Sequence, residues 1–113
     1  LGEVLVDGDG RTLYLFDPDE RGPSTCVDEC ATNWPPLLDE EPEAGPGVSA
    51  DLLDTADRDD GTAQVTYDGW PLYHWIADEE PGDVNGQGVE DVWWVVRADG
   101  SPLREKAASA PSY

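Results

Sequence analysis

The sequence has little positive charge. Its 113 residues include 6 Lys and Arg against 26 Asp and Glu, which sets the net charge at −20 at pH 7. Nucleic acids and anionic lipids are bound mainly by Lys and Arg that neutralise phosphates, and Lys106 with a few arginines supplies few such contacts. The composition therefore excludes nucleic acid and anionic lipid surfaces as partners.

Long apolar runs are also absent. No stretch approaches the roughly 18 apolar residues that a membrane span needs, and no basic segment followed by an apolar one opens the chain. We expect no insertion into a membrane by this segment, and we expect Leu1 to begin a mature or trimmed domain. A lipid anchor upstream of Leu1 is compatible with this expectation.

The excess of acidic residues opposes a compact state. The net charge of −20 is far outside the magnitude of about 2–8 that is usual for a small soluble domain. Molar salt shortens the Debye length to about 3 Å and removes most of the repulsion. We therefore predict an origin in a salt-adapted organism. The rival interpretation, a disordered acidic chain, is disfavoured by the 5 Trp and by repeated aromatic segments.

Two segments, 3–19 and 64–78, predict β-hairpins. In each segment, runs of alternating apolar and polar residues flank a turn that contains Asp-Gly. We interpret the segments as pseudo-repeats of one hairpin, in which the Tyr and the second aromatic of each copy point inward. The second strands align as Leu13-Tyr14-Leu15-Phe16 with Leu72-Tyr73-His74-Trp75, and the copies end in Asp19 and Asp78.

The other elements complete a single domain. Residues 91–97 are rich in β-branched and aromatic side chains and predict a central strand. Short helices are predicted at 24–33, capped by Ser24 or Thr25, and at 49–56, capped by Ser49. The fold class is therefore mainly β, or β-rich α+β, with an antiparallel sheet made of two pseudo-repeated hairpins and a Trp-rich strand. This domain spans residues 1–103, with an acidic loop at 39–47 and a tail at 104–113.

The tryptophans are expected mainly in the core. Trp93 and Trp94 are adjacent, so in a strand they point to opposite faces. Both faces must then be covered, or one aromatic is exposed and marks a binding surface.

The two copies of Tyr-x-aromatic-x-x-Asp, Tyr14 to Asp19 and Tyr73 to Asp78, resemble a family of secreted and lipoprotein repeats of unknown function that carries this motif. The resemblance implies an extracellular or cell-surface location, commonly with a lipid anchor in bacteria, and it implies no established function. It covers nearly the whole chain, through Ser24-Thr25-Cys26, Cys30-Ala31, Trp34-Pro35-Pro36-Leu37, the loop at 81–88 and Trp93-Trp94-Val95-Val96.

Cys26 and Cys30 carry two interpretations. On a regular helix, Cβ atoms at this spacing lie about 5–6 Å apart, whereas a disulfide needs about 3.5–4.5 Å, so a bond requires a helix end or an irregular turn. Given the location that the resemblance implies, we favour a structural disulfide, worth roughly 2 kcal/mol for so short a loop. The alternative is a metal or redox site in which both thiolates and His74, the sole histidine, hold copper or zinc.

The segment 83–91 has the spacing of a calcium loop. Its twelfth position is Trp94, where a calcium loop has a bidentate Glu, so an ordinary connection between strands is favoured over weak calcium binding. The oxygen-bearing residues are Asp83, Asn85, Gln87 and Asp91, with Gly88 at the sixth position.

Asp19 and Asp78 suggest a carboxylate dyad, but we expect each to accept backbone N–H bonds in the turn after its strand. No Ser-His-Asp or Cys-His set is assignable, because no motif places the single His. We therefore predict no catalytic residues, no enzyme activity and no cofactor. The predicted function is a non-enzymatic surface, binding or structural module whose partner is an unknown protein or cell-surface component. The alternative is a copper-binding or redox-associated secreted protein.

Overall fold

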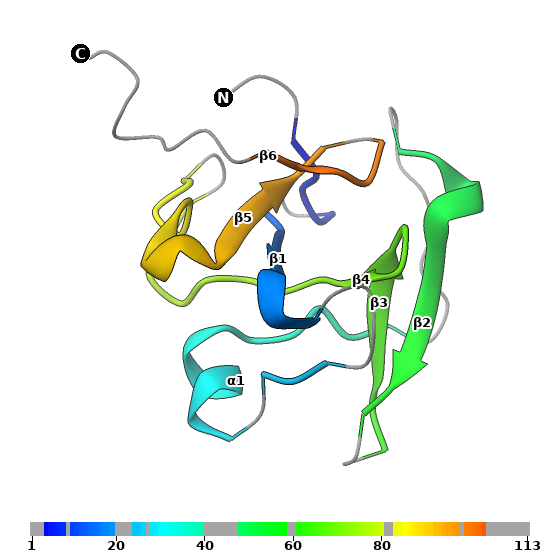
Figure 1. Cartoon of the computed structure of the whole chain (residues 1–113), viewed down its shortest axis with the longest axis horizontal. Coiled ribbons are helices and arrows are strands. Elements are labelled where there is room, and N and C mark those ends of the chain that lie inside the picture. The colour runs from blue at the N-terminus through cyan, green and yellow to red at the C-terminus, as the bar shows by residue number, and fades with distance from the viewer. Residues whose placement is uncertain are drawn as a thin grey trace.

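Figure 1 shows the computed structural model of the chain, which describes residues 4–8, 10–19, 24–26, 28–39, 48–58, 61–80, 83–97 and 99–103. The predicted tail at 104–113 and most of the predicted loop at 39–47 lie outside these residues. The strands are β1 (Tyr14–Phe16), β2 (Leu53–Asp57), β3 (Ala63–Tyr67), β4 (Trp70–Pro71), β5 (Trp93–Val96) and β6 (Pro102–Leu103). The helical elements are α1 (Glu29–Asn33) and the 3-10 turns η1 (Asp17–Asp19), η2 (Ala50–Leu52) and η3 (Val89–Asp91).

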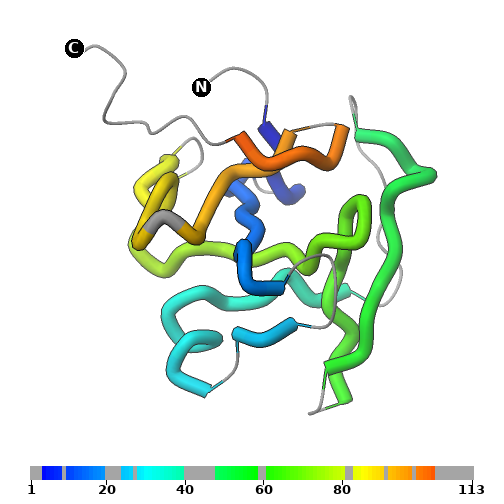
Figure 2. Tube along the Cα trace, viewed as in Figure 1, coloured from blue at the N-terminus to red at the C-terminus, as the bar shows by residue number. Residues whose placement is uncertain are grey.

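The strands form two antiparallel sheets, which confirms the mainly β fold class. One sheet has the order β1-β5-β6 and the other has the order β2-β3-β4. β5 is the middle strand of its sheet, as predicted for residues 91–97. Figure 2 shows the chain after β4 crossing the molecule past β1. Main-chain bonds between Tyr14 and Tyr73 join the two sheets at this crossing.

Both predicted hairpins contain antiparallel pairing. In the first, Val6 bridges Thr12, and the N–H of Leu13 donates to the carbonyl of Leu5. In the second, β3 pairs with β4 across a two-residue turn at Asp68 and Gly69. These turn residues have φ values of 52° and 85°, the left-handed conformation that a tight hairpin turn requires and that Asp-Gly adopts readily. That the hairpins are copies of one ancestor stays a prediction.

The helices differ from the predictions. α1 begins at Glu29, and the Thr25 hydroxyl, which was expected to cap it, donates to Asp19 Oδ1 instead. The predicted helix at 49–56 is wrong: η2 occupies one turn without a side-chain cap from Ser49, and the chain then enters β2. β2 pairs along its whole length with β3. Pairing with β3 is favoured over the predicted helix because a helix of two turns is marginal in water without tertiary contacts.

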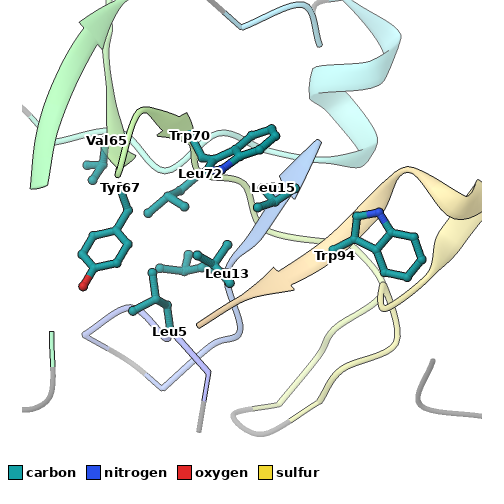
Figure 3. Packing of buried hydrophobic residues seen from close by; sticks show 9 residues of the cluster. Leu5, Leu13, Leu15, Val65, Tyr67, Trp70, Leu72 and Trp94 are labelled. Carbon is teal, nitrogen blue, oxygen red and sulfur yellow. The ribbon is translucent and has the colours of Figure 1, made fainter. Parts of the chain in front are cut away.

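Side-chain alternation divides the interior into two clusters. Trp93 and Trp94 are 3% and 5% exposed, so both faces of β5 are covered, and neither ring is an exposed binding platform. Figure 3 shows Leu5 and Leu13 of the first hairpin facing Tyr67 and Leu72 of the second. This aliphatic core comprises Leu5, Leu13, Leu15, Val65, Tyr67, Trp70, Leu72, Trp94 and Val96.

The second cluster, the aromatic core, lies on the other face of β1 and β5. Phe16 and Trp75, the second aromatics of the two motifs, pack against it together with the motif tyrosines, so each motif directs both rings inward as predicted. Its buried members are Tyr14, Cys26, Trp34, Tyr73, Trp93, Val95 and Leu103. In the part of the chain that the structure describes, no helix has the length and apolar character needed to cross a membrane.

Candidate functional site

The two Tyr-x-aromatic-x-x-Asp motifs meet where the sheets join. Tyr14 and Tyr73 lie opposite each other in antiparallel chain segments. The N–H of Tyr14 donates to the carbonyl of Tyr73 over 2.9 Å, and the N–H of Tyr73 donates to the carbonyl of Tyr14 over 3.0 Å. This pairing brings the tyrosine of each motif to the aspartate of the other.

The side chains of the two motifs are bonded crosswise. The Tyr14 hydroxyl donates to Asp78 Oδ2 over 2.6 Å, and the Tyr73 hydroxyl donates to Asp19 Oδ2 over 2.7 Å. All four residues are buried. Hydrogen bonds to an ionised acceptor at such lengths are about twice as strong as neutral ones. We call these four residues the crossed Tyr–Asp pairs. The aspartate of each motif receives its phenol donor from the other motif.

The Asp19 carboxylate has further donors in the segment that precedes α1. The Thr25 N–H and Thr25 hydroxyl each donate to Asp19 Oδ1 over 2.7 Å. The Ser24 hydroxyl is hydrogen-bonded to the Tyr73 hydroxyl. Arg58, at the end of β2, donates to Ser24 Oγ over 3.0 Å and adds a positive charge near Asp19.

The Asp78 carboxylate is held in a similar way. The Asn85 N–H donates to Asp78 Oδ1 over 2.8 Å, and the Gly86 N–H donates to the Tyr14 hydroxyl over 3.1 Å. Arg11 donates a hydrogen bond to the Asp78 carbonyl. A Cβ at Gly86 would lie 2.9 Å from the Tyr14 ring, so the close approach of this backbone to the tyrosine requires glycine.

Burial sets the protonation behaviour of the crossed Tyr–Asp pairs. Desolvation raises the pKa of Asp19 and of Asp78, while the hydrogen bonds from Thr25 and Tyr73 to Asp19, and from Tyr14 and Asn85 to Asp78, oppose this rise. Desolvation also raises the pKa of Tyr14 and Tyr73 far above the ordinary value of 10.0. The two phenols therefore stay protonated at neutral pH and act as hydrogen-bond donors. Each aspartate accepts a backbone N–H bond, as predicted, but the donors are Thr25 and Asn85, which lie beyond the turn directly after each strand.

Cys26 and Cys30 form a disulfide with Cα atoms 5.1 Å apart. Cys30 lies in α1, and Cys26 lies ahead of it, where the irregular start of the helix allows the approach. Cys26 is fully buried within the aromatic core. Arg58 Nη2 donates to the Cys26 carbonyl over 2.9 Å, which links the disulfide segment to the β2 end and to Asp19. The favoured sequence interpretation, a structural disulfide, is confirmed.

The structure does not assemble the predicted site of Cys26, Cys30 and His74. The sulfurs are bonded to each other and are not thiolates, while His74 Nε2 lies 2.7 Å from Asp7 Oδ2. Within the described ranges, no group of three or more His, Cys, Asp and Glu residues is placed to hold a metal ion. Binding of copper or zinc by the reduced chain stays a prediction.

The residues of the predicted calcium loop bond to separate partners. Asp83 Oδ2 accepts the N–H groups of Glu79 and Glu80, over 3.0 Å and 3.1 Å. Asn85 donates to the Ala77 carbonyl over 3.2 Å. The buried Gln87 side chain accepts the N–H of Val95 and donates to the carbonyl of Leu103, over 2.8 Å and 2.6 Å. The structure does not describe the Asp91 side chain. The two Gln87 bonds fasten the loop to β5 and β6, a structural role that the spacing alone did not indicate.

Four aromatic rings stack in one file beside the crossed Tyr–Asp pairs. Neighbouring ring centroids are 4.3, 3.7 and 4.0 Å apart, and the planes of neighbouring rings differ by 25°, 2° and 25°. The middle rings are buried, while the outer rings are half-buried. We call this file the aromatic stack; in order, it consists of Phe16, Trp93, Trp34 and Trp75.

Sequence reasoning missed several residues of the site. The motif pointed to Tyr14, Tyr73, Asp19 and Asp78, but nothing in their spacing indicated that the pairs are crossed. The other missed residues, which come from distant segments, are Arg11, Ser24, Trp34, Arg58 and Gly86.

The chain matches a family model over most of its length. A family described as "secreted repeat of unknown function" matches residues 1–38 and 54–97, which include both motifs, both cysteines and the whole aromatic stack. No curated protein and no solved structure matches the chain.

Proposed function

The chain belongs to the family of secreted repeats of unknown function, and on that premise we propose that it is a non-enzymatic extracytoplasmic module that binds or supports other components of the cell surface. The observation that carries the proposal is the crossing of the Tyr–Asp pairs. The residues that define the motif are engaged with each other in the interior, where their bonds join the two sheets.

Burial of the motif argues against a catalytic role for it. A general acid or base must come within hydrogen-bond reach of the substrate proton, about 2.6–3.2 Å, or act through one water. Asp19 is 4% exposed and Asp78 is 2% exposed, and each carboxylate already accepts bonds at both oxygens. The motif is therefore not in direct contact with a substrate or partner, and binding is assigned to the surface.

The surface chemistry favours a cationic or neutral partner. The net charge of −20 repels other polyanions and attracts cations over distances that depend on salt. The disulfide suits a location outside the cytoplasm, where oxidised cysteines persist. We propose adaptation to a salty medium as the reason for the charge, since screening permits the compact state.

The test asks whether binding to the cell surface depends on the crossed Tyr–Asp pairs. The oxidised chain is incubated with isolated cell envelopes of the source organism, and the bound fraction is measured as a function of chain concentration. We expect saturable binding that Tyr14→Phe leaves unchanged below its melting temperature, because that hydroxyl is buried. Loss of affinity in a folded Tyr14→Phe protein would place the motif in the binding site and contradict the proposal.

A charge variant serves as the matched control. Glu79→Gln with Glu80→Gln changes two exposed side chains next to the second motif and leaves their backbone bonds to Asp83 in place. If the acidic surface binds the partner, this variant should bind more weakly and with a smaller dependence on salt, while its melting temperature stays the same or rises. Turnover of a small-molecule substrate that disappears in folded Asp78→Asn would instead establish an enzyme.

A further inference from the structure

The aromatic stack is not the arrangement that packing alone favours. Buried aromatic pairs usually adopt offset or edge-to-face contacts with centroids about 4.5–7 Å apart. The planes of Trp34 and Trp93 differ by 2° and their centroids are 3.7 Å apart, so these rings lie nearly face to face. Face-to-face overlap lets two indoles share the positive charge that remains after one of them loses an electron. The geometry therefore lowers the energy needed to remove an electron from this core.

Each middle ring of the stack touches one tyrosine of the crossed Tyr–Asp pairs. Tyr14 meets Trp34 edge-on at 5.5 Å between centroids, and Tyr73 meets Trp93 edge-on at 5.2 Å. A phenol gives up an electron easily only when its proton leaves at the same time. Such a transfer needs an acceptor within about 2.6–3.2 Å.

The motif aspartates are placed as these acceptors. Asp78 Oδ2 lies 2.6 Å from the Tyr14 hydroxyl, and Asp19 Oδ2 lies 2.7 Å from the Tyr73 hydroxyl. A phenol with the ordinary pKa of 10.0 is already protonated at neutral pH, and burial raises the pKa of both tyrosines further, so their protons do not leave by simple ionisation. Each middle tryptophan is thus next to a tyrosine whose proton has a carboxylate to receive it.

We propose that the aromatic stack and the crossed Tyr–Asp pairs form a one-electron relay that serves a cationic oxidant at the protein surface. The oxidant takes one electron from half-buried Trp75, and the resulting hole moves to Trp34. Tyr14 then gives one electron to Trp34 while its proton passes to Asp78, which leaves a neutral tyrosyl radical and a neutral carboxylic acid. Tyr73 and Asp19 do the same for Trp93.

The relay is reset by a one-electron reductant, for which we name an external thiol. The thiol gives one electron through the stack to the tyrosyl radical, releases its own proton to water and becomes a thiyl radical. The proton on the aspartate returns to the tyrosine, so electrons and protons balance over the cycle. At low ionic strength, where the net charge of −20 is unscreened, it raises the encounter rate of a cationic oxidant and lowers that of an anionic one; at molar salt this preference is lost.

The test is flash-quench oxidation of the disulfide-bonded chain with a cationic ruthenium(III) polypyridyl complex. Transient absorption measures the rate of oxidation, and electron paramagnetic resonance identifies the radical. We expect a tryptophan radical that decays into a tyrosyl radical. Trp75→Phe should slow oxidation by an order of magnitude, because phenylalanine keeps a ring in the stack but is much harder to oxidise. Asp78→Asn with Asp19→Asn should leave a longer-lived tryptophan radical and little tyrosyl radical.

Matched variants separate the relay from ordinary oxidation of any tryptophan or tyrosine. Trp70→Phe removes a buried indole from the aliphatic core and should leave the rate unchanged. Tyr14→Phe with Tyr73→Phe should abolish the tyrosyl signal, while Tyr67→Phe should keep it. Equal slowing by Trp70→Phe and Trp75→Phe, or a tyrosyl radical that survives in the Tyr14→Phe, Tyr73→Phe protein, would overturn the proposal. Circular dichroism at the same temperature confirms that each variant is folded, and Trp75→Phe, at the half-buried end of the stack, perturbs folding least.

Discussion

The crossed Tyr–Asp pairs predict a specific coupling energy between residues far apart in sequence. Tyr14→Phe keeps the ring in the aromatic core and removes only the hydroxyl, which donates to Asp78 over 2.6 Å and accepts from Gly86 over 3.1 Å. Hydrogen bonds to charged groups contribute about 1.5–3 kcal/mol, and a buried N–H left without a partner adds about 1 kcal/mol or more. We therefore expect Tyr14→Phe to lower the free energy of unfolding by about 3 kcal/mol.

The interaction itself is isolated by a double-mutant cycle with Asp78→Asn. Residues in one hydrogen-bond network show coupling energies of about 0.5–3 kcal/mol, and a charge-assisted bond in the interior should fall in the upper part of this range. The cycle is measured by urea unfolding at high salt, followed by circular dichroism. Tyr73→Phe with Asp19→Asn forms the second cycle and should give a coupling of similar size.

The control cycle combines Asp78→Asn with Tyr67→Phe. Tyr67 is also a fully buried tyrosine, and its hydroxyl accepts the Ser49 N–H over 2.9 Å, but it lies in the aliphatic core. These two substitutions should be additive. A coupling between Tyr14 and Asp78 no larger than this control would show that the crossed bond contributes nothing beyond general packing, and would refute the reasoning.

Three further predictions concern salt, redox state and pH. Because a net charge of −20 must be screened, the melting temperature should rise steeply from low to molar salt, and a flat profile would contradict salt adaptation. Reduction of the Cys26–Cys30 disulfide should lower the free energy of unfolding, measured in urea, by about 2 kcal/mol. Native mass spectrometry of the reduced chain and of its His74→Ala variant with Cu(I) or Zn tests metal binding. Burial raises the pKa of Tyr14 and Tyr73 above 10.0, the ordinary value that both recover on unfolding. Above pH 10 unfolding therefore releases protons, so the free energy of unfolding is unaffected below pH 10 and falls above it. Tyr14→Phe with Tyr73→Phe should flatten this alkaline fall in pH-dependent urea unfolding.

Much of the fold could be predicted from local patterns. The alternation of Trp93 and Trp94, the Asp-Gly turn at residues 68–69 and the inward motif aromatics all follow from the period-two geometry of strands, and each was predicted. Strand β2 was not predictable in this way, and a helix was predicted at 49–56 instead, because the conformation of this segment depends on pairing with β3, which lies farther along the chain. The conformation of a short segment is decided by its tertiary partners, and intrinsic propensity is a weak guide to that conformation.

The site was harder to predict than the fold because its contacts are long-range. The motif identified the tyrosines and aspartates, yet the sequence of one copy does not indicate that its tyrosine bonds to the aspartate of the other copy. The stack is a stronger case, since Trp34 follows α1 while its neighbours come from β5 and the second motif. Nothing in the spacing of these residues encodes their order in space. Long-range main-chain pairing produces it: Phe16 pairs with Trp93, and Tyr73 bridges both Tyr14 and Pro36.

The crossing has a consequence for how repeats of this family can be arranged. A hairpin with one motif supplies a tyrosine donor and a buried aspartate acceptor, but in this chain the two bond to the opposite copy and not to each other. A lone copy that kept its aspartate buried would lack the tyrosine donor, and an unpaired buried charge costs several kcal/mol. Copies of the motif should therefore fold in pairs, either within one chain or between two chains that each carry a single copy. Separate expression of the two halves of this protein should give fragments that are unfolded alone and that fold on mixing, because each then receives the phenol that its aspartate requires.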